Sequence, residues 1–360
     1  MKNLLHVVGA RPNFMKMAPV HAAISAETPF RQKIVHTGQH YDDRMSAVFF
    51  EQLDIPVPDI NLEVGSGSHA VQTAAIMQGF EKVVLDESPD LVLVYGDVNS
   101  TVAAALVCSK LQVPVAHVEA GLRSRDRTMP EEINRLVTDQ LSDYLFTPSQ
   151  DGDDNLAQEN IGPEKIFRVG NVMIDTLVRL LPRARQLDPL PDLAREAFGL
   201  VTLHRPANVD DPRMLTGILA ALEEISRKIP LLFPVHPRTR TNMAAVESGR
   251  SDHRLHVVDP LGYLEFLSLQ SRAALVITDS GGIQEETTYL GIPCLTLREN
   301  TERPVTLMEG TNVLVGSDPG RLIEEVTAIL SRGSKPAGIP DLWDGRAARR
   351  IAAILAEKLS

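Results

Sequence analysis

Acidic residues stand where three short segments of the chain change from an apolar run to a polar one. Asp97 ends the run in DLVLVYGD, Glu119 follows VPVAHV, and Glu131 lies near the start of a helical pattern in MPEEINR. Carboxylates at the ends of neighbouring strands can converge and serve as general acid and base. A carboxylate in a first helical turn also complements the helix dipole, so Glu131 and Glu132 fit either role.

A different segment is suited to a phosphate group. The run LVITDSGGIQEETTYL passes through Ser280, Gly281 and Gly282 into a helical pattern that carries Glu286. Glycine lets the backbone approach a ligand closely, and a helix N-terminus offers free N–H groups and a positive dipole end. We therefore expect this turn to cradle a phosphate, with a tight turn that binds nothing as the alternative. A glutamate so close to it should face elsewhere, for example toward sugar hydroxyls.

Cations and histidines follow other apolar runs. Arg11 and Lys16 come after LLHVVG, and they are either phosphate ligands or ordinary solvated cations. His204 in TLHRP, His236 in FPVHPR and His117 in VAHVEAG could each donate to an oxyanion.

Two patterns argue against a bound cofactor. The histidines are scattered and lack the i, i+4 spacing of a helical zinc site, so no metal is predicted. The segment GSGSHA at 65–70 fits G-x-G-x-x-A, but it does not follow the first strand, which disfavours a nicotinamide dinucleotide.

Composition limits the class of protein. The 360 residues suffice for two domains, and a formal charge of −11 gives no footprint for nucleic acid or an anionic membrane. No apolar stretch approaches the roughly 18 to 20 residues that span a bilayer, so we expect a cytoplasmic protein without a signal peptide. Cys108 and Cys294 lie in apolar segments and are interpreted as buried, inert thiols.

Short runs rich in β-branched residues alternate with longer segments of helical period. Most of the short runs are apolar at nearly every position, as strands buried on both faces of a parallel sheet should be. The pattern predicts the α/β class, with two Rossmann-like, doubly wound lobes that join near 180–191. Ligands of such sheets bind beyond the carboxyl ends of the strands, so we expect the site in the cleft between the lobes. The runs are LLHVVG, IVHTG, DLVLVYGD, VPVAHVEAG, DYLFTPS, GLVTLHR, LLFPVHP, LHVVDP, ALVITDS and PCLTL.

Several motifs occur in a fixed order, namely GARPNFMKMAP, YGDVNST, HVEAGLRS, MPEEINR, VGNVMIDTL, TLHRP, PVHPR, TDSGGIQEE and TERP. From residue 5 to about 316 they closely resemble the non-hydrolysing UDP-N-acetylglucosamine 2-epimerases. The resemblance implies the GT-B architecture, with an acid–base lobe at 1–178 and a UDP-binding lobe at 179–343. It also implies that the C-terminal helix, within 344–360, packs back on the first lobe, and that the protein is a homodimer.

The resemblance further implies an activity, the inversion of C2 in UDP-N-acetylglucosamine (UDP-GlcNAc) to give UDP-N-acetylmannosamine (UDP-ManNAc), without a cofactor. By similarity, the catalytic positions are Asp97, Glu119, Glu131 and His204. By similarity, the substrate-binding positions are Arg11, Lys16, Arg205, His236, Phe266, Ser280, Gly281, Gly282 and Glu286.

The chemistry needs groups of these kinds. The hydrogen on C2 is not beside a carbonyl, so direct abstraction would leave an unstabilised carbanion, and departure of UDP from C1 must help. Elimination gives a 2-acetamidoglucal and UDP, which then adds back while a proton reaches the opposite face of C2. Carboxylates on both sides of the sugar are therefore expected, with His204 and the Ser-Gly-Gly turn stabilising the diphosphate.

Other functions stay open at this point. A relative that acts on UDP-2,3-diacetamido-2,3-dideoxyglucuronate would need a cation for the C6 carboxylate, which Arg123 or Arg125 could supply. A GT-B glycosyltransferase would need a cleft for its acceptor. A non-catalytic UDP-sugar sensor would bind the nucleotide but never exchange the C2 hydrogen. A hydrolysing epimerase would use the same elimination and release the free sugar.

Three segments depart from the family pattern. Pro206, Ala207 and Asn208 stand where many members have Arg-Glu-Asn, which weakens the substrate assignment. The segments TGQHYDDRMS at 37–46 and GSGSHAV at 65–71 lack residues that bind an activating second UDP-GlcNAc in several members, so weak or no homotropic activation is expected.

Overall fold

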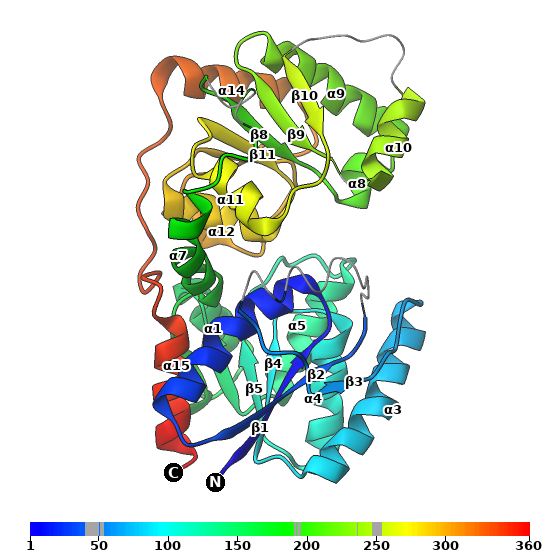
Figure 1. Cartoon of the computed structure of the whole chain (residues 1–360), viewed down its shortest axis with the longest axis vertical. Coiled ribbons are helices and arrows are strands. Elements are labelled where there is room, and N and C mark those ends of the chain that lie inside the picture. Colours follow the sequence, from blue (N-terminus) through cyan, green and yellow to red (C-terminus); the bar gives the residue numbers. More distant parts are fainter. Residues whose placement is uncertain (40–49, 51–53, 191, 193–195, 236, 247–253) are drawn as a thin grey trace. The chain divides into compact units, whose positions relative to one another are not determined.

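The computed structural model describes residues 1–39, 50, 54–190, 192, 196–235, 237–246 and 254–360. The chain divides into two compact units, which are drawn in Figure 1. Unit 1 comprises Met1–Arg179 and Asp341–Ser360, and unit 2 comprises Leu180–Pro340. Each unit is built on one parallel sheet flanked by helices, so the predicted α/β class with two doubly wound lobes is confirmed.

Unit 1 has a seven-stranded parallel sheet in the order β3-β2-β1-β4-β5-β6-β7. The central strands are buried along their length because nearly all their residues are apolar. The edge strands β3 and β7 are two and three residues long and carry no apolar run, so their sequences gave no strand signal. The strands are β1 (Asn3–Val8), β2 (Arg31–His36), β3 (Ile60–Asn61), β4 (Leu91–Tyr95), β5 (Val115–Val118), β6 (Tyr144–Thr147) and β7 (Ile166–Arg168).

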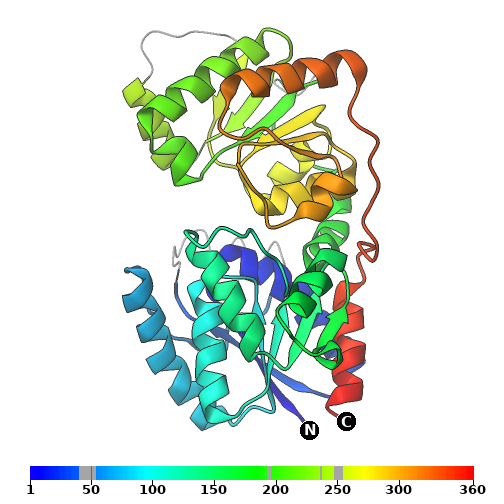
Figure 2. The same ribbon diagram turned by 180° about the vertical axis from the view of Figure 1, so that it is seen from behind.

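The helices of unit 1 form two groups (Figures 1 and 2). The last helix, α15, lies beside α1, whereas α3, α4 and α5 pack successively against one another. The helices are α1 (Arg11–Glu27), α3 (His69–Glu87), α4 (Asn99–Leu111), α5 (Pro130–Leu141), α6 (Gln150–Gln158), α7 (Val172–Ala184) and α15 (Ala347–Lys358), with a 3-10 turn at Pro163–Lys165.

The C-terminal segment is fastened to unit 1 by buried polar contacts. The Asp175 carboxylate on α7 accepts the N–H groups of Ala347 at 3.1 Å and Ala348 at 2.8 Å, at the N-terminus of α15. Burial raises the pKa of Asp175 to about 6. The buried Trp343 donates its Nε1 hydrogen to the Pro148 carbonyl at 2.9 Å.

Helix α1 continues through an internal proline. Because Pro19 has no N–H, it cannot bond the Met15 carbonyl one turn earlier. The Thr176 hydroxyl, on α7, donates to that carbonyl instead, at 2.6 Å. This substitute bond keeps the first turns of α1 in place, including the buried Lys16.

Unit 2 has a six-stranded parallel sheet in the order β10-β9-β8-β11-β12-β13. Its strands are β8 (Gly199–Thr202), β9 (Leu231–Pro234), β10 (Leu255–Val258), β11 (Leu275–Thr278), β12 (Cys294–Thr296) and β13 (Asn312–Leu314). Its helices are α8 (Pro206–Val209), α9 (Pro212–Ser226), α10 (Pro237–Val246), α11 (Tyr263–Gln270), α12 (Gly281–Leu290), α13 (Pro304–Met308) and α14 (Pro319–Arg332).

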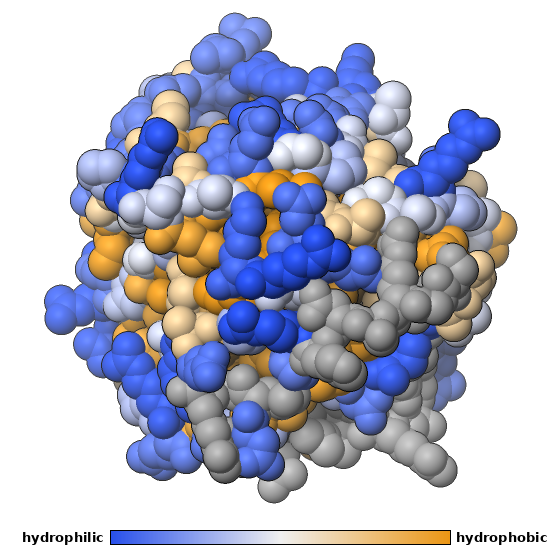
Figure 3. Space-filling model, turned by 90° about the horizontal axis from the view of Figure 1, so that it is seen from above, coloured by the Kyte–Doolittle hydropathy of each residue, from blue (hydrophilic) through white to orange (hydrophobic). Residues whose placement is uncertain are grey.

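The molecular face in Figure 3 is mainly hydrophilic, with smaller hydrophobic patches among the charged side chains. Scattered apolar patches of this kind are normal on a protein surface. Among the described residues, no helix has both the length and the apolar character needed to cross a membrane.

Both sheets reverse their strand order beside the first strand of the unit. In unit 1 the reversal lies between β1 and β4, and in unit 2 it lies between β8 and β11. Loops leave such a point in opposite directions, which opens a crevice at the carboxyl ends of the two strands. The candidate residues are therefore described below from these two points.

Candidate active site

Lys16 and Glu119 form a buried ion pair at the reversal point of unit 1. The Lys16 Nζ atom lies 2.5 Å from Glu119 Oε2, and the two side chains are only 7% and 3% exposed. Lys16 comes from the second turn of α1, and Glu119 follows β5. The structure thus brings together two residues that are 103 positions apart in the sequence (119 − 16).

The backbone around this pair is left-handed at three positions. Gly96, Glu119 and Gly121 have φ angles of 62°, 74° and 81°. Glycine adopts left-handed φ angles freely. The same conformation is sterically strained for Glu119, so contacts with its surroundings must stabilise it. At Gly96 a Cβ would lie 2.7 Å from Lys16 Nζ, so any larger residue would displace the ammonium group.

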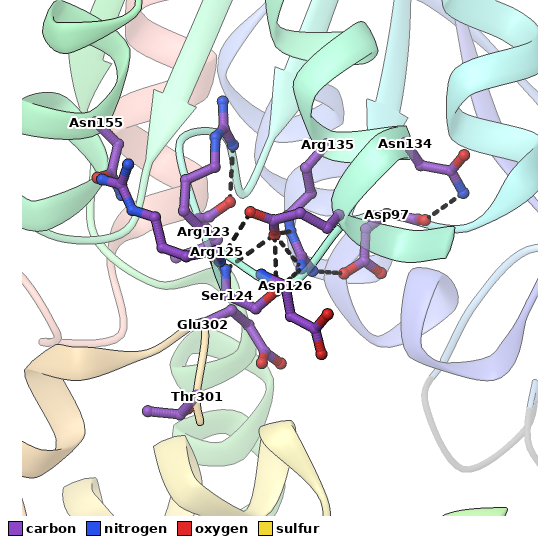
Figure 4. Close-up of polar contacts among 12 residues, drawn as sticks. Asp97, Arg123, Ser124, Arg125, Asp126, Asn134, Arg135, Asn155, Thr301 and Glu302 are labelled. Atoms are coloured by element: carbon purple, nitrogen blue, oxygen red, sulfur yellow. Dashed lines mark hydrogen bonds and ion pairs between the residues drawn. The ribbon is translucent and has the colours of Figure 1, made fainter. Parts of the chain in front are cut away.

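Asp97 is held by an arginine from α5, as Figure 4 shows. Arg135 Nη1 pairs with Asp97 Oδ2, while its Nη2 donates to Glu132 Oε2 at 2.7 Å. Glu132 also accepts the N–H groups of Ser124 and Arg125, each at 2.9 Å. Burial would raise the pKa of Glu132, but the bonds from Arg135 and Ser124 outweigh it, and the pKa is lowered. Glu132 is thereby a structural acid that shapes the loop after β5.

Glu131 has a different environment from Glu132. It lines a pocket of about 270 Å³ together with Asp97. Within the described part of the chain its carboxylate makes no hydrogen bond or ion pair, although the side chain is half-buried. The other lining residues are Gln39, Ser66, Gly67, His69, Gln72, Val98, Asn99, Pro130 and Asn134.

The carboxamides of this pocket are linked to one another. Asn99 donates to Gln72 Oε1 at 2.8 Å, and Asn134 donates to the Asp97 carbonyl at 2.9 Å. Gln39 accepts the Ser100 hydroxyl hydrogen at 2.7 Å. These bonds fix the side chains around the two acids.

Arg11 and Asn13 stand at the start of α1. The Arg11 side chain is exposed, so it can reach a ligand, whereas the Asn13 side chain is buried and forms hydrogen bonds that hold the turn. Asn13 Oδ1 accepts the Ala10 N–H at 3.0 Å, and its Nδ2 donates to the Tyr95 carbonyl at 2.7 Å. The sequence motif contained Asn13, but nothing in its type distinguished it from a solvent-exposed asparagine.

In unit 2 a single buried carboxylate organises the loop after β8. Asp279, just beyond β11, accepts the His204 N–H at 3.1 Å and the Arg205 N–H at 2.9 Å. His204 Nδ1 lies 2.8 Å from Asp279 Oδ1, and Asn208 donates to Oδ2 at 3.0 Å. Burial would raise the pKa of Asp279, but the bond from His204 leads the contacts that outweigh it, so the pKa is lowered. The His204 side chain is 57% exposed, with its Nδ1 occupied.

The Ser280 turn joins this loop to α12. Arg205 Nε donates to the Asp279 carbonyl at 3.0 Å, immediately before Ser280. Ser280 is the N-cap residue, and its side chain makes no capping bond in the described structure. The first-turn N–H groups are therefore not satisfied by the cap and remain suited to an anion. A Cβ on Gly281 would lie 2.6 Å from Arg303 Nη1, so the glycine also makes room for a buried guanidinium.

Glu286 lies one turn further along α12. Tyr263 on α11 donates its hydroxyl hydrogen to Glu286 Oε1 at 2.8 Å. Burial raises the pKa of Glu286 to about 7. Phe266, on the same helix as Tyr263, is partly buried and packs against an apolar cluster that includes Phe198 and Leu269.

Some sequence expectations concern residues that the structure does not describe or uses differently. His236 and most of the segment 37–46 lie outside the described residues. Arg123 was offered as a cation for a sugar carboxylate, but it is 4% exposed and pairs with Asp139 at 2.7 Å and Glu159 at 2.6 Å. The described residues hold no group of three or more His, Cys, Asp and Glu side chains that could bind a metal.

Comparison with known proteins places this arrangement in a family. The UDP-N-acetylglucosamine 2-epimerase family model matches residues 22–356. The UDP-N-acetylglucosamine 2-epimerase of Methanocaldococcus jannaschii is 41% identical over 362 residues, which cover 97% of this chain and 97% of that protein. The UDP-2,3-diacetamido-2,3-dideoxy-D-glucuronate 2-epimerase of Pseudomonas aeruginosa is 44% identical over 358 residues, which cover 98% of this chain and 99% of that protein.

A solved structure agrees with these matches. The crystal structure of Methanocaldococcus jannaschii UDP-GlcNAc 2-epimerase in complex with UDP-GlcNAc and UDP aligns with a TM-score of 0.88 and 42% identity, covering 99% of each chain. The resemblance seen in the sequence motifs is confirmed. The chain belongs to the UDP-N-acetylglucosamine 2-epimerase family.

Proposed function

We propose that this enzyme interconverts UDP-GlcNAc and UDP-ManNAc by eliminating UDP from the sugar and adding it back. Membership of the family makes it an isomerase that acts at C2 of a UDP-linked 2-acetamido sugar. The observation that carries the mechanism is the position of Asp97, Glu119 and Glu131. Two of these acids line one pocket, and the third is ion-paired with Lys16 at the same reversal point of the unit 1 sheet.

In the first step a carboxylate takes the proton from C2 while the bond from C1 to the UDP oxygen breaks. The electrons of the C2–H bond form the C1=C2 double bond, and those of the C1–O bond leave with UDP. In the second step UDP attacks C1 again, and a carboxylic acid on the other face delivers a proton to C2. The sugar loses one proton and gains another, so the two carboxyl groups exchange their protonation states, and proton exchange with water restores them.

The accessible acids are assigned the proton transfers. Asp97 and Glu131 both line the pocket, so each can approach a sugar carbon. Glu119 is almost completely buried against Lys16, and we assign this pair to holding charge beside the sugar. A matched acid and base, one on each face, is what inversion at C2 requires.

The nucleotide is assigned to unit 2. The open first turn of α12, with Ser280, Gly281 and Gly282, is suited to the diphosphate. Because His204 Nδ1 is engaged by Asp279, its Nε2 is the atom left to meet the departing diphosphate oxygen. Arg11 and Arg205 add positive charge, Glu286 receives the ribose hydroxyls, and Phe266 lies by the uracil in this proposal.

Proton exchange with solvent tests the mechanism. UDP-GlcNAc incubated with the enzyme in deuterium oxide should lose its C2 hydrogen signal in the NMR spectrum, and the recovered UDP-ManNAc should carry deuterium at C2. Product without label would rule out proton removal.

Variants test the assignment of the acids. Asp97→Asn and Glu131→Gln should each lower kcat by roughly 10² to 10⁴ with limited effect on KM. Glu81→Gln, at an exposed acid on α3, is the control and should behave as the wild type. An increase in KM alone would reassign the residue concerned to binding.

A second substrate is favoured by one comparison and one side chain. The Pseudomonas aeruginosa relative named for UDP-2,3-diacetamido-2,3-dideoxy-D-glucuronate is 44% identical. Arg125 is exposed, and its Nη2 donates to the Asn155 amide oxygen at 2.6 Å. A sugar carboxylate could accept this hydrogen bond in place of the amide oxygen. If that sugar is the substrate, Arg125→Gln should lower kcat/KM for it about tenfold and leave UDP-GlcNAc turnover unchanged. Equal turnover of the uronate by the variant would end this candidate.

The setting of the enzyme is also proposed. We infer that the enzyme is a cytoplasmic homodimer. It binds a UDP-sugar, and it binds neither nucleic acid nor a membrane. Cys108 and Cys294 are buried and free, which suits a reducing compartment. Light scattering coupled to gel filtration should give twice the chain mass of 39.5 kDa, and a monomer mass would refute the dimer.

A further inference from the structure

A buried histidine touches the turn that precedes Asp97. His117, in β5, has no exposed surface, and its Nε2 lies 2.8 Å from the Gly96 carbonyl oxygen. Its Nδ1 lies 2.6 Å from Asp139 Oδ1. Each ring nitrogen therefore faces an oxygen atom, and the imidazole bridges the turn before Asp97 to the Asp139 carboxylate.

Asp139 also touches the turn that follows Glu119. Its Oδ2 accepts the Gly121 N–H at 3.1 Å and lies 2.7 Å from Arg123 Nη2. The carboxylate is completely buried in the middle of these donors. Burial would raise its pKa, but His117 and then Arg123 oppose this, and the pKa is lowered.

The two turns carry the candidate acids. Gly96 immediately precedes Asp97, and Gly121 stands two positions after Glu119. Both glycines and Glu119 itself have left-handed backbones, which persist only where the surroundings hold them. One carboxylate on α5 therefore fixes both turns, one directly and one through the imidazole ring.

We propose that Asp139, acting through His117, is a positioning residue that sets the placement of Asp97 relative to Glu119 for proton transfer at C2. The inference rests on the proposed epimerase mechanism. Asp139 itself stays out of contact with the sugar, because it is fully buried and its oxygens are taken by His117, Gly121 and Arg123. Its effect should appear in kcat and not in nucleotide binding.

Several charged groups surround His117 and Asp139. Asp139, from α5, contacts the imidazole directly, and Arg123, from the loop after β5, contacts the other oxygen of Asp139. Glu159, at the end of α6, pairs with the outer side of Arg123. Lys16 and Glu119 lie on the other side, next to Gly96.

The test is the split between kcat and KM in Asp139→Asn. An amide has only one oxygen, so it cannot accept from His117 on one side and from Gly121 and Arg123 on the other. We expect kcat to fall about tenfold, with KM within about twofold and an unchanged Kd for UDP. Wild-type kcat, or a Kd for UDP that rises as much as kcat falls, overturns the proposal.

Two further variants separate this effect from a general loss of structure. Glu159→Gln alters the outer partner of Arg123 and should keep the wild-type kcat and KM. In Asp139→Asn/His117→Gln the fall in kcat should be no larger than in Asp139→Asn alone, because both residues act on one path, and additive falls would overturn the relay through His117.

His117→Gln alone gives a test that does not need Asp139→Asn to fold. It should lower kcat about tenfold, with an unchanged Kd for UDP, and wild-type kcat would overturn the proposal. If the wild-type enzyme itself incorporates no deuterium at C2, the proposed function fails first. Normal exchange in every variant leaves the function standing and removes only the positioning role.

Discussion

The reversal points of the two sheets are built in the same way but end in different chemistry. In each, a buried aspartate accepts backbone hydrogen bonds from a neighbouring loop. Asp139 in unit 1 accepts the N–H of Gly121, and Asp279 in unit 2 accepts those of His204 and Arg205. In unit 1 the candidate acids are then bound to cations, Glu119 to Lys16 and Asp97 to Arg135. In unit 2 the turn ends in an open helix N-terminus.

This difference matches the role proposed for each unit. Proton transfer needs acids held at fixed places, and ion pairs with buried partners provide that restraint. Binding a diphosphate needs backbone donors left available, which glycine and an uncapped helix provide. Breaking a contact in unit 1 should therefore affect turnover, and breaking one in unit 2 should affect nucleotide affinity.

Among the contacts that hold the two reversal points, the buried ion pair of unit 1 should have the largest effect when it is broken. Lys16→Met leaves Glu119 buried without its cation, which typically costs about 3–5 kcal/mol of unfolding free energy. We expect kcat to fall by roughly 10² to 10³, because the displaced carboxylate no longer holds charge beside the sugar. Urea unfolding and steady-state kinetics measure both effects.

A double variant checks the cause. Lys16→Met/Glu119→Gln removes both charges, so it should regain part of the lost stability while remaining nearly inactive. If the double variant is as unstable as Lys16→Met, the ion pair is not what stabilises this point.

The second effect concerns the aspartate of unit 2. Asp279→Asn places an amide N–H₂ group, a donor, against the backbone donors of His204 and Arg205. One buried N–H group then lacks an acceptor, which costs about 1–3 kcal/mol of unfolding free energy. The Kd for UDP, measured by calorimetry, should rise about 10- to 100-fold.

Asp211 offers a matched control for this substitution. It caps α9 at the surface by accepting the Arg213 N–H at 2.8 Å, and asparagine caps a helix about as well as aspartate. Asp211→Asn should leave the Kd unchanged. Equal Kd values for Asp279→Asn and the wild type would contradict the role of Asp279.

A third, smaller effect is expected at the glycine turn. Gly281→Ala brings a methyl group to within 2.6 Å of Arg303 Nη1, whose guanidinium is also bound to Glu285 at 2.7 Å. Moving this guanidinium should shift the first turn of α12 and weaken UDP binding about tenfold. Gly338→Ala is the control, because no described heavy atom lies within 4 Å of its added Cβ.

The smallest effect is a pH dependence of stability from Glu286. Its pKa is raised by burial to about 7, so the protonated form is favoured in the folded protein. The stability that this group contributes is present below the pKa of about 4.3 of an unfolded glutamate and is lost as pH rises through 7. From about pH 6 to pH 8 the wild type should lose about 1 kcal/mol relative to Glu286→Gln.

Urea unfolding of both proteins across this range measures the difference. Glutamine resembles the protonated acid and cannot ionise, so its unfolding free energy should lack this component. Parallel curves for the two proteins would show that Glu286 is already ionised below pH 6.

Strong apolar runs made the central strands predictable, and short ones did not. β4 is apolar throughout, β11 is apolar up to its last residue, and both were expected from the sequence, whereas β3 and β13 have two and three residues and lack such a run. The short strands form because a neighbouring strand already offers its hydrogen-bonding edge, which is a property of the folded sheet. Pattern alone could not supply it.

The site shows the same limit. Asp97, Glu119 and Glu131 stand at strand or helix ends, so their type and place marked them as candidates. Asp139 and Arg135 lie inside α5, where a charged residue normally faces solvent, yet they are 1% and 2% exposed. Only their partners in other elements explain why they are buried.

The sequence by itself determined the α/β class, the two doubly wound lobes and the family, because period and ordered motifs are properties of the chain. Tertiary structure decided which charges meet: Lys16 with Glu119, Arg135 with Asp97, and Asp139 with the two turns. The physical reason is that an ion pair or hydrogen bond depends on distance through space. Residues far apart along the chain acquire such a distance only when the strands between them pair.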